Sequence, residues 1–257
     1  MAIIKISDLC ITLQNRKILE GLSLDINTGI LAILGPNGVG KTSLLRAIIG
    51  DIKPAPGSIF LGGQDLSGMK NREIAQIITI VPQEHNPVFS YSVEDIVLMG
   101  RGPYIKPLGV PSESDRAIAN DAIEKIGISH LRKRIYTELS GGERKLVLIA
   151  MAICQETEII LLDEPTVFLD LYNAHRILDL VKRFSIDEKK TIILVLHDVN
   201  YALLCTDKAL LIYDSTNFLE GNPREIINAK NLSKLYNIQF EPGKTESNNK
   251  FIMPLIR

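Results

Sequence analysis

The glycine-rich segment 35–42 constrains the fold of this chain more than any other segment. It reads Gly-Pro-Asn-Gly-Val-Gly-Lys-Thr, which fits G-x-x-x-x-G-K-[ST], and it lies between the apolar run Ile30–Leu34 and an expected helix at Ser43–Ile49. In such a strand–loop–helix unit the glycines let successive backbone N–H groups turn inward, and the helix N-terminus adds a partial positive charge. A chance glycine-rich turn is the alternative, but the flanking strand and helix favour a loop that cradles phosphates.

Two side chains of this loop have expected roles. The Lys41 ammonium can reach the β- and γ-phosphates of a nucleotide, and the Thr42 hydroxyl can ligate Mg²⁺. We therefore predict that the chain binds ATP and Mg²⁺ and hydrolyses the nucleotide. The residues expected to bind nucleotide in this segment are Gly35, Pro36, Asn37, Gly38, Val39, Gly40, Lys41, Thr42 and Ser43.

Short apolar runs alternate with helical stretches along the chain, which predicts an α/β fold with a mostly parallel sheet and helices on both faces. The segment 84–154 is mainly helical, and we expect it to form a lobe inserted in a domain of residues 1–240. Its helices are expected to start at Ser112 and at Ser140. We expect the polar tail 241–257 to pack loosely. The expected strands are Ala2–Ile6, Ile30–Leu34, Ile77–Val81, Glu158–Leu162, Thr191–Leu196 and Ala209–Tyr213.

Composition argues against several classes of protein. The 257 residues include 29 basic and 30 acidic ones, a balance that gives no electrostatic reason to expect a nucleic-acid partner. Cys10, Cys154 and Cys205 are far apart, so we expect reduced thiols in a cytoplasmic protein. The chain shows neither a signal-peptide pattern nor an apolar run near the roughly 20 residues that span a bilayer. Any work at a membrane would be that of a peripheral subunit.

Polar residues at four further places are candidates for the chemistry. Asp163 and Glu164 end a buried strand, where Asp163 could hold Mg²⁺ through water and Glu164 could polarise an attacking water, or the pair could cap the next helix. Ser140, Gly141, Gly142 and Glu143 form a capping box, and the same helix end could bind an anion. Gln83 and His197 follow two other strands, and neither is informative alone.

Taken together and in this order, these segments resemble the nucleotide-binding subunit of the ATP-binding cassette family over about residues 1–240. The resemblance implies a cassette fold with an antiparallel β edge and a signature at Leu139–Glu143. It also implies a D-loop at Leu169-Asp170. Two copies would face each other head to tail, with ATP between Lys41 of one and Ser140–Gly142 of the other. Glu164 would orient water, His197 would contact the γ-phosphate and Gln83 would sense the metal.

A narrower resemblance links the chain to the importers of metal chelates, which carry iron siderophores, haem, cobalamin or molybdate. The matching segments are Tyr91–Arg101, Leu196–Asn200 and Asn231–Tyr236. The implied partners are transmembrane permease subunits, reached from the cytoplasmic side of the membrane, and indirectly a substrate-binding protein. The apolar residues Phe89, Tyr91, Val93 and Met99 would receive a permease helix, or they form a small core of the lobe. A cassette ATPase that assembles iron–sulfur clusters without a permease is the alternative function.

The chain departs from the family pattern at four places. The aromatic residue that usually stacks on adenine would fall near Leu13, so that base binding would rely on Ile18. The helix after the signature has lost charges that usually form salt bridges in the lobe, because it carries Lys145-Leu146 and Met151. The remaining departures are the bulky pair Val167-Phe168 before Asp170, and Asp214–Asn217 in place of an Asp-Gly turn.

Overall fold

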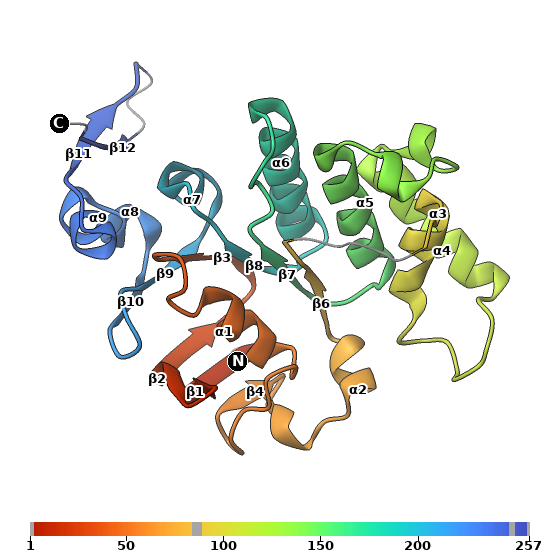
Figure 1. The fold of residues 1–257 in the computed structure, drawn as a ribbon, viewed down its shortest axis with the longest axis horizontal. Helices are drawn as coiled ribbons and strands as arrows, with labels where there is room; N and C mark the ends of the chain where they lie inside the picture. Colours follow the sequence, from red (N-terminus) through yellow and green to blue (C-terminus); the bar gives the residue numbers. More distant parts are fainter. Residues whose placement is uncertain (1–2, 84–88, 247–249, 256–257) are drawn as a thin grey trace.

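A computed structural model gives the fold and describes residues 3–83, 89–246 and 250–255 (Figure 1). Its central sheet has the strand order β10-β9-β3-β8-β7-β6, in which all neighbours are parallel except β10 and β9. The predicted α/β fold, with a parallel core and an antiparallel edge, is confirmed. The strands are β3 (Gly29–Leu34), β6 (Ile78–Val81), β7 (Ile159–Asp163), β8 (Thr191–Val195), β9 (Lys208–Ile212) and β10 (Phe218–Gly221).

Two hydrophobic cores lie on opposite faces of this sheet. Successive residues of a strand point to opposite faces, so Ile160 and Leu162 enter one core while Ile159 and Leu161 enter the other. Helix α1 (Lys41–Ile48) packs in the second core, which it shares with an antiparallel sheet of order β2-β1-β4-β5. That sheet comprises β1 (Ile4–Leu13), β2 (Arg16–Ile26), β4 (Ile59–Leu61) and β5 (Gln64–Asp65).

The other core is covered by helices, including those of segment 84–154. Helix α4 (Glu113–Ile126) begins after the capping box of Ser112, which confirms its predicted start, and is followed by Gly127, whose left-handed backbone (φ 74°) suits glycine. The remaining helices are α2 (Asn71–Ala75), α3 (Val93–Leu98), α5 (Gly141–Cys154), α6 (Leu171–Asp187), α7 (Val199–Cys205), α8 (Pro223–Ile226) and α9 (Ala229–Tyr236), with 3₁₀ turns at Leu66–Gly68, Met99–Arg101, Ser129–Leu131 and Tyr136–Glu138.

A buried arginine joins the helices of this segment. The Arg101 guanidinium, on the turn after α3, donates to Asp115 of α4 at 3.0 Å. It also donates at 2.9 Å to the Cys154 carbonyl at the end of α5 and at 2.8 Å to Glu156. The same guanidinium lies 4.1 Å from the centre of the Tyr104 ring. The salt bridges of Arg101 therefore hold these helices together, although Leu146 and Met151 of α5 are uncharged where the family pattern has charged residues.

The C-terminal tail is better packed than we expected. Strands β11 (Phe240–Lys244) and β12 (Lys250–Pro254) form a hairpin, and the Ile252 side chain is buried. Asn200 of α7 makes two hydrogen bonds to the backbone of Ile252. The expectation of loose packing fails at Ile252, which packs on α7, whereas most other described side chains of the hairpin are exposed or half-buried. None of the helices in the described part of the chain has the length and apolar character needed to cross a bilayer.

Candidate functional site

The phosphate loop lies between β3 and α1, as its sequence predicts. Gly40 has a left-handed backbone (φ 114°), and a β-carbon there would lie 2.8 Å from the Ile18 side chain, so only glycine fits. No side chain caps the N-terminus of α1. The first N–H groups of this helix are therefore available to an anion held in the loop.

The Lys41 side chain is folded back into the loop. It is 5% exposed, and its ammonium donates to the carbonyls of Gly35 at 2.8 Å and Pro36 at 2.9 Å. Burial lowers the pKa of Lys41, while the carboxylates of Glu164 and Asp163 act in the opposite direction. The ammonium is thus held beside the loop by neutral carbonyl oxygens, which a phosphate could replace.

Thr42 and Asp163 meet at the start of α1 and the end of β7. The Thr42 hydroxyl donates to Asp163 Oδ2 at 2.9 Å, and Asp163 is 4% exposed. Burial raises the pKa of Asp163, the Glu164 charge adds to this rise, and the Thr42 hydrogen bond and Lys41 oppose it. Asp163 Oδ1 is buried and lacks a hydrogen-bond partner among the described residues. A hydroxyl and a carboxylate with an unpaired oxygen fit a Mg²⁺ ion, which prefers oxygen ligands.

Three side chains from the ends of three strands meet at Glu164. Gln83 Nε2 donates to Glu164 Oε2 at 2.8 Å, and His197 Nε2 lies 2.6 Å from Glu164 Oε1. Because β6, β7 and β8 are parallel neighbours, residues just past their carboxyl ends emerge at one edge of the sheet. The Glu164 backbone is left-handed (φ 49°), a strained conformation of the kind found at functional sites.

A cavity of about 310 Å³ lies over the loop. Gln83 and Glu164 line one side of it, and Ile18 lines another. Ile18 also lines a neighbouring hollow of about 440 Å³ with Tyr213 and Asp214, whereas Leu13 lines neither. The remaining lining residues of the cavity are Asn37, Gly38, Gly40, Lys41, Thr42 and Ser43.

Ser140, Gly141, Gly142 and Asp170 do not line this cavity within the described chain. Ser140 and Glu143 form the predicted capping box, in which Glu143 accepts from the Ser140 N–H at 2.8 Å and from its hydroxyl at 2.7 Å. These bonds lower the pKa of Glu143. Asp170 caps α6 through Asn173, and a β-carbon at Gly142 would lie 2.8 Å from the Asn173 amide. The signature and the D-loop are therefore neighbours.

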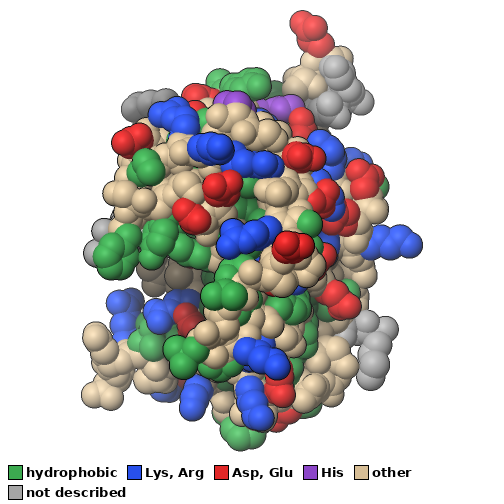
Figure 2. All heavy atoms as spheres, turned by 90° about the vertical axis from the view of Figure 1, so that its right-hand side faces the viewer, with side chains coloured by type: hydrophobic (Ala, Val, Ile, Leu, Met, Phe, Trp, Pro, Cys, Tyr) green, Lys and Arg blue, Asp and Glu red, His purple; other side chains and the backbone are tan. Residues whose placement is uncertain are grey.

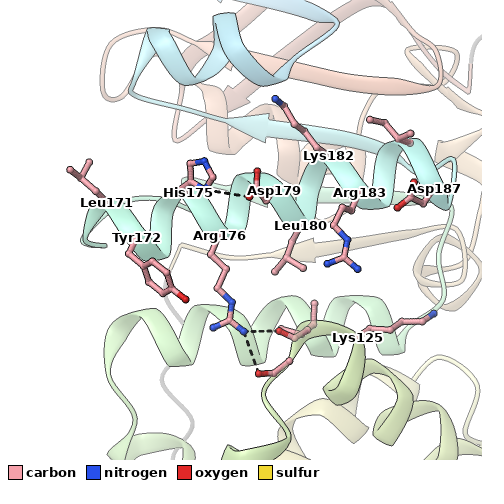
Figure 3. A pocket seen from close by; sticks show the side chains of 13 residues that line it. Lys125, Leu171, Tyr172, His175, Arg176, Asp179, Leu180, Lys182, Arg183 and Asp187 are labelled. Carbon is pink, nitrogen blue, oxygen red and sulfur yellow. Dashed lines mark hydrogen bonds and ion pairs between the residues drawn. The ribbon is translucent and has the colours of Figure 1, made fainter.

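A larger groove of about 900 Å³ runs along α6 and begins at Leu171, the residue after Asp170 (Figure 3). Figure 3 shows Tyr172 and Leu171 at one end and Lys125 on the opposite wall. Arg176, which reaches across, already donates to the carbonyls of Ile126 at 2.8 Å and Gly127 at 3.3 Å. Those bonds close the C-terminal end of α4, so this arginine is explained by the fold.

The sequence predicted no role for Lys145 at the site, and marked it only as a departure from the family pattern. Lys145 of α5 is 6% exposed, and its ammonium donates to the carbonyls of Pro82 at 3.1 Å and Gln83 at 2.9 Å. It connects the signature helix to the backbone that carries Gln83. The available signal was a lysine on the apolar face of a helix, where an unpaired charge is rare.

Comparison with known proteins identifies the family of this chain. The family described as ABC transporter matches residues 19–167, more than half of the chain. The achromobactin transport ATP-binding protein CbrD of Dickeya dadantii is 35% identical over 239 residues, 93% of this chain and 89% of that protein. The molybdate import ATP-binding protein MolC of Haemophilus influenzae is 39% identical over 220 residues, 85% and 81% of the two chains.

A solved structure, described as an inward-facing metal-chelate type ABC transporter, matches with a TM-score of 0.88 and 33% identity, covering 100% of this chain and 99% of that one. The phosphate loop, the carboxylates at the end of β7 and these likenesses agree with one another. The chain belongs to the ABC transporter family, and within it to the ATPases.

Proposed function

We propose that this chain is the ATP-hydrolysing subunit of an importer for a metal chelate. The observation that carries the proposal is the convergence of Gln83, Glu164 and His197 beside the phosphate loop. In this arrangement Glu164 orients the attacking water, and His197 contacts the γ-phosphate. In-line attack on a phosphoryl group depends mainly on positioning and charge, both of which these groups supply.

Magnesium completes the proposed site. Thr42, Asp163 and Gln83 would hold it, and the unpaired Asp163 Oδ1 supports this assignment. When bound, the ion neutralises charge on the phosphate oxygens. Lys41 binds the β- and γ-phosphates, for which it must leave the carbonyls of Gly35 and Pro36. Asp163 must be ionised, and Lys41 and Lys145 favour its charged form.

A head-to-tail homodimer would bring the signature to the nucleotide. Ser140, Gly141 and Gly142 lie outside the cavity of their own chain, and a β-carbon at Gly141 would meet open space. This exposed helix end is thus free to face the γ-phosphate held by Lys41 of a second copy. Asp170, beside it, would contact the partner at the same interface.

The test of the catalytic assignment is Glu164→Gln in the full chain. We expect it to bind ATP and lose steady-state turnover, because the carboxylate orients water without being needed for affinity. Light scattering with ATP should then show a trapped dimer. Glu158→Gln is the matched control, since Glu158 is exposed at the opposite end of the same strand. Near-normal turnover of Glu164→Gln would contradict the proposal that Glu164 orients the attacking water.

The surface of segment 84–154 supports a permease partner. Figure 2 looks onto the side of the molecule that carries α3 and α4, where hydrophobic side chains lie among charged ones. Phe89 is 66% exposed, whereas Val93 is fully buried in the core. Tyr91 is half-buried, and its ring meets that of Phe89 edge-on at 6.0 Å. The four residues predicted to receive a permease helix therefore do not form one surface. Val93 belongs to the core of the lobe, whereas Phe89 is exposed.

Phe89→Asp tests this surface better than a change at Tyr91 would. We expect basal ATP hydrolysis to stay near normal, and co-purification with the permease from solubilised membranes to be lost. Ile186→Asp is the control, because Ile186 is equally exposed but lies on α6. Retained co-purification would exclude Phe89 from the interface. A chain that never co-purifies with a permease would favour an assembly role.

The cargo class rests on likeness to the relatives. Achromobactin and molybdate appear in the names of two of them, and the matched structure is of metal-chelate type. We propose an iron complex of a siderophore or haem, cobalamin, or molybdate as cargo, delivered by a substrate-binding protein. The subunit would associate peripherally with the cytoplasmic side of the membrane. Mass spectrometry of the co-purified permease would identify the system.

A further inference from the structure

The segments Leu196–Asn200 and Asn231–Tyr236, of which only His197 has an expected role, lie close together in the structure. Helix α7 starts directly after His197 and Asp198, and the C-terminal hairpin packs on it. Helix α9 ends at Tyr236, whose ring contacts Phe240 at the start of β11. Figure 1 shows α9 and the hairpin at the blue end of the chain, on the opposite side of the molecule from α3 and α4.

Asn200 makes the contact between the hairpin and the turn that carries His197. Its side-chain amide donates to the Ile252 carbonyl at 3.0 Å and accepts from the Ile252 N–H at 2.9 Å. Pro242 lies opposite Ile252 in the hairpin and has no N–H to donate. The Asn200 amide thus pairs with the outward-facing backbone of β12 as a neighbouring strand would.

The same asparagine is tied to the turn on its other side. Its backbone N–H donates at 2.8 Å to Asp198 Oδ1, which caps α7. His197 precedes Asp198, and its Nε2 lies 2.6 Å from Glu164. An unbroken set of contacts therefore runs from Ile252 through Asn200 to the histidine at the phosphate loop.

A second contact reaches the phosphate loop from the same segment. Burial raises the pKa of the Tyr236 hydroxyl to about 12, the nearby Gly35 N–H opposes this rise, and the Asp198 charge adds to it. The C-terminal segment thus lies near the first residue of the loop, and the charge of Asp198 acts on its tyrosine.

We propose that Asn200 is a positioning residue for His197, and that the C-terminal hairpin holds the turn 197–200 through it. This inference rests on the proposed role of His197. Positioning matters because a displacement of about 1 Å at a reacting group can lower a rate by up to roughly a hundredfold. The hairpin would then act on turnover and leave phosphate binding at Lys41 unchanged.

The test compares kcat and ATP affinity of the full chain with and without Asn200→Ala. We expect kcat to fall roughly tenfold and the dissociation constant for ATP to stay within about twofold. Asn231→Ala is the control, because it removes a similar 2.8 Å bond, to the Ile226 carbonyl, without reaching α7. We expect Asn231→Ala to have a thermal midpoint similar to that of Asn200→Ala and an unchanged kcat.

His197→Ala separates the two proposals. If it keeps normal turnover, the role of His197 fails; if it loses turnover while Asn200→Ala is normal, only the inference about Asn200 is overturned. In the His197→Ala background, adding Asn200→Ala should lower the residual rate no further. A further drop, or a loss of ATP affinity in proportion to kcat, would mean that Asn200 serves only folding.

Discussion

Replacing Arg101 with methionine should strongly destabilise this protein, although Arg101 touches none of the residues proposed to bind ATP. The side chain is 6% exposed and makes three hydrogen bonds of 3.0 Å or less. Methionine has a similar length but no donors. The change therefore leaves the largely buried carboxylate of Asp115 without its cation and the buried Cys154 carbonyl without a donor.

The magnitude follows from these partners. Removing one member of a buried ion pair costs about 3–5 kcal/mol, and an unsatisfied buried carbonyl costs about 1–3 kcal/mol within that total. The Glu156 contact adds at most about 1 kcal/mol, because that carboxylate is 54% exposed and screened by water. We expect Arg101→Met to lower the free energy of unfolding by about 2–3 kcal/mol, at or below the lower end of this range, because Asp115 keeps its two hydrogen bonds from Ser112.

Urea denaturation followed by circular dichroism measures this difference. Arg46→Met is the matched control, because the Arg46–Asp51 pair is 3.8 Å apart and about half exposed, and should contribute less than about 1 kcal/mol. If the two variants agree within about 1 kcal/mol, the buried network does not hold the helices as argued.

Acid should weaken the same network. Hydrogen bonds from Ser112, followed by that from Arg101, lower the pKa of Asp115 from 3.8 to about 2. A carboxyl group with a lowered pKa stabilises the fold fully above its unfolded value, and that stability disappears as the pH falls from 3.8 toward 2. The Arg101→Met variant should show a shallower loss of stability across this window.

Three further changes test the site. Lys41→Ala should weaken binding of a fluorescent ATP analogue, since it removes the charge directed at the terminal phosphates; unchanged affinity would mean that the loop does not engage phosphate. Ile18→Ala should weaken ATP binding several-fold while Leu13→Ala does not, because Ile18 lines the cavity and Leu13 does not; equal effects would mean that the adenine binds at another surface. Tyr236→Phe should change the thermal midpoint little, since no described residue makes a well-aligned hydrogen bond with the buried hydroxyl, and a clear drop would show that the nearby Gly35 N–H donates to it.

The joint role of Gln83, Glu164 and His197 was implied by the family resemblance, since the residues themselves showed only that each lies just past an apolar strand. Parallel pairing of β6, β7 and β8 then brings Gln83, Glu164 and His197 to one edge without further information. The long strand β2 was missed, although Leu22, Leu24 and Ile26 alternate with exposed Ser23 and Asp25, a pattern that indicates a half-buried strand.

Contacts between distant segments could not be predicted. Lys145 binds the carbonyls of Pro82 and Gln83, and Asn200 binds the backbone of Ile252. Both depend on which backbone groups the finished fold leaves unpaired, and no local pattern encodes that. Val93 was wrongly grouped with exposed residues for a related reason, because the partners that bury it come from other elements.

The bulky turn before Asp170 was noted as a departure from the family pattern, and the structure shows that it is also strained. Phe168 has a left-handed backbone (φ 62°) while its side chain is 89% exposed. Such a conformation costs a residue with a β-carbon about 1–2 kcal/mol, and glycine adopts it freely. Little packing would be lost on removing this ring.

Phe168→Gly should therefore stabilise the isolated chain. The relieved strain is larger than the entropic cost of ordering glycine, which is about 0.5–1 kcal/mol. The free energy of unfolding should therefore rise by roughly 0.5–1 kcal/mol. Tyr172→Gly, at an exposed position of α6, should instead lose about 0.5 kcal/mol, because glycine disfavours a helix. If both variants unfold at lower urea than the parent, the strain at Phe168 is absent in solution. If Phe168→Gly gains stability but loses ATP-driven dimerisation, the strained turn is retained for the partner that it meets beside Asp170.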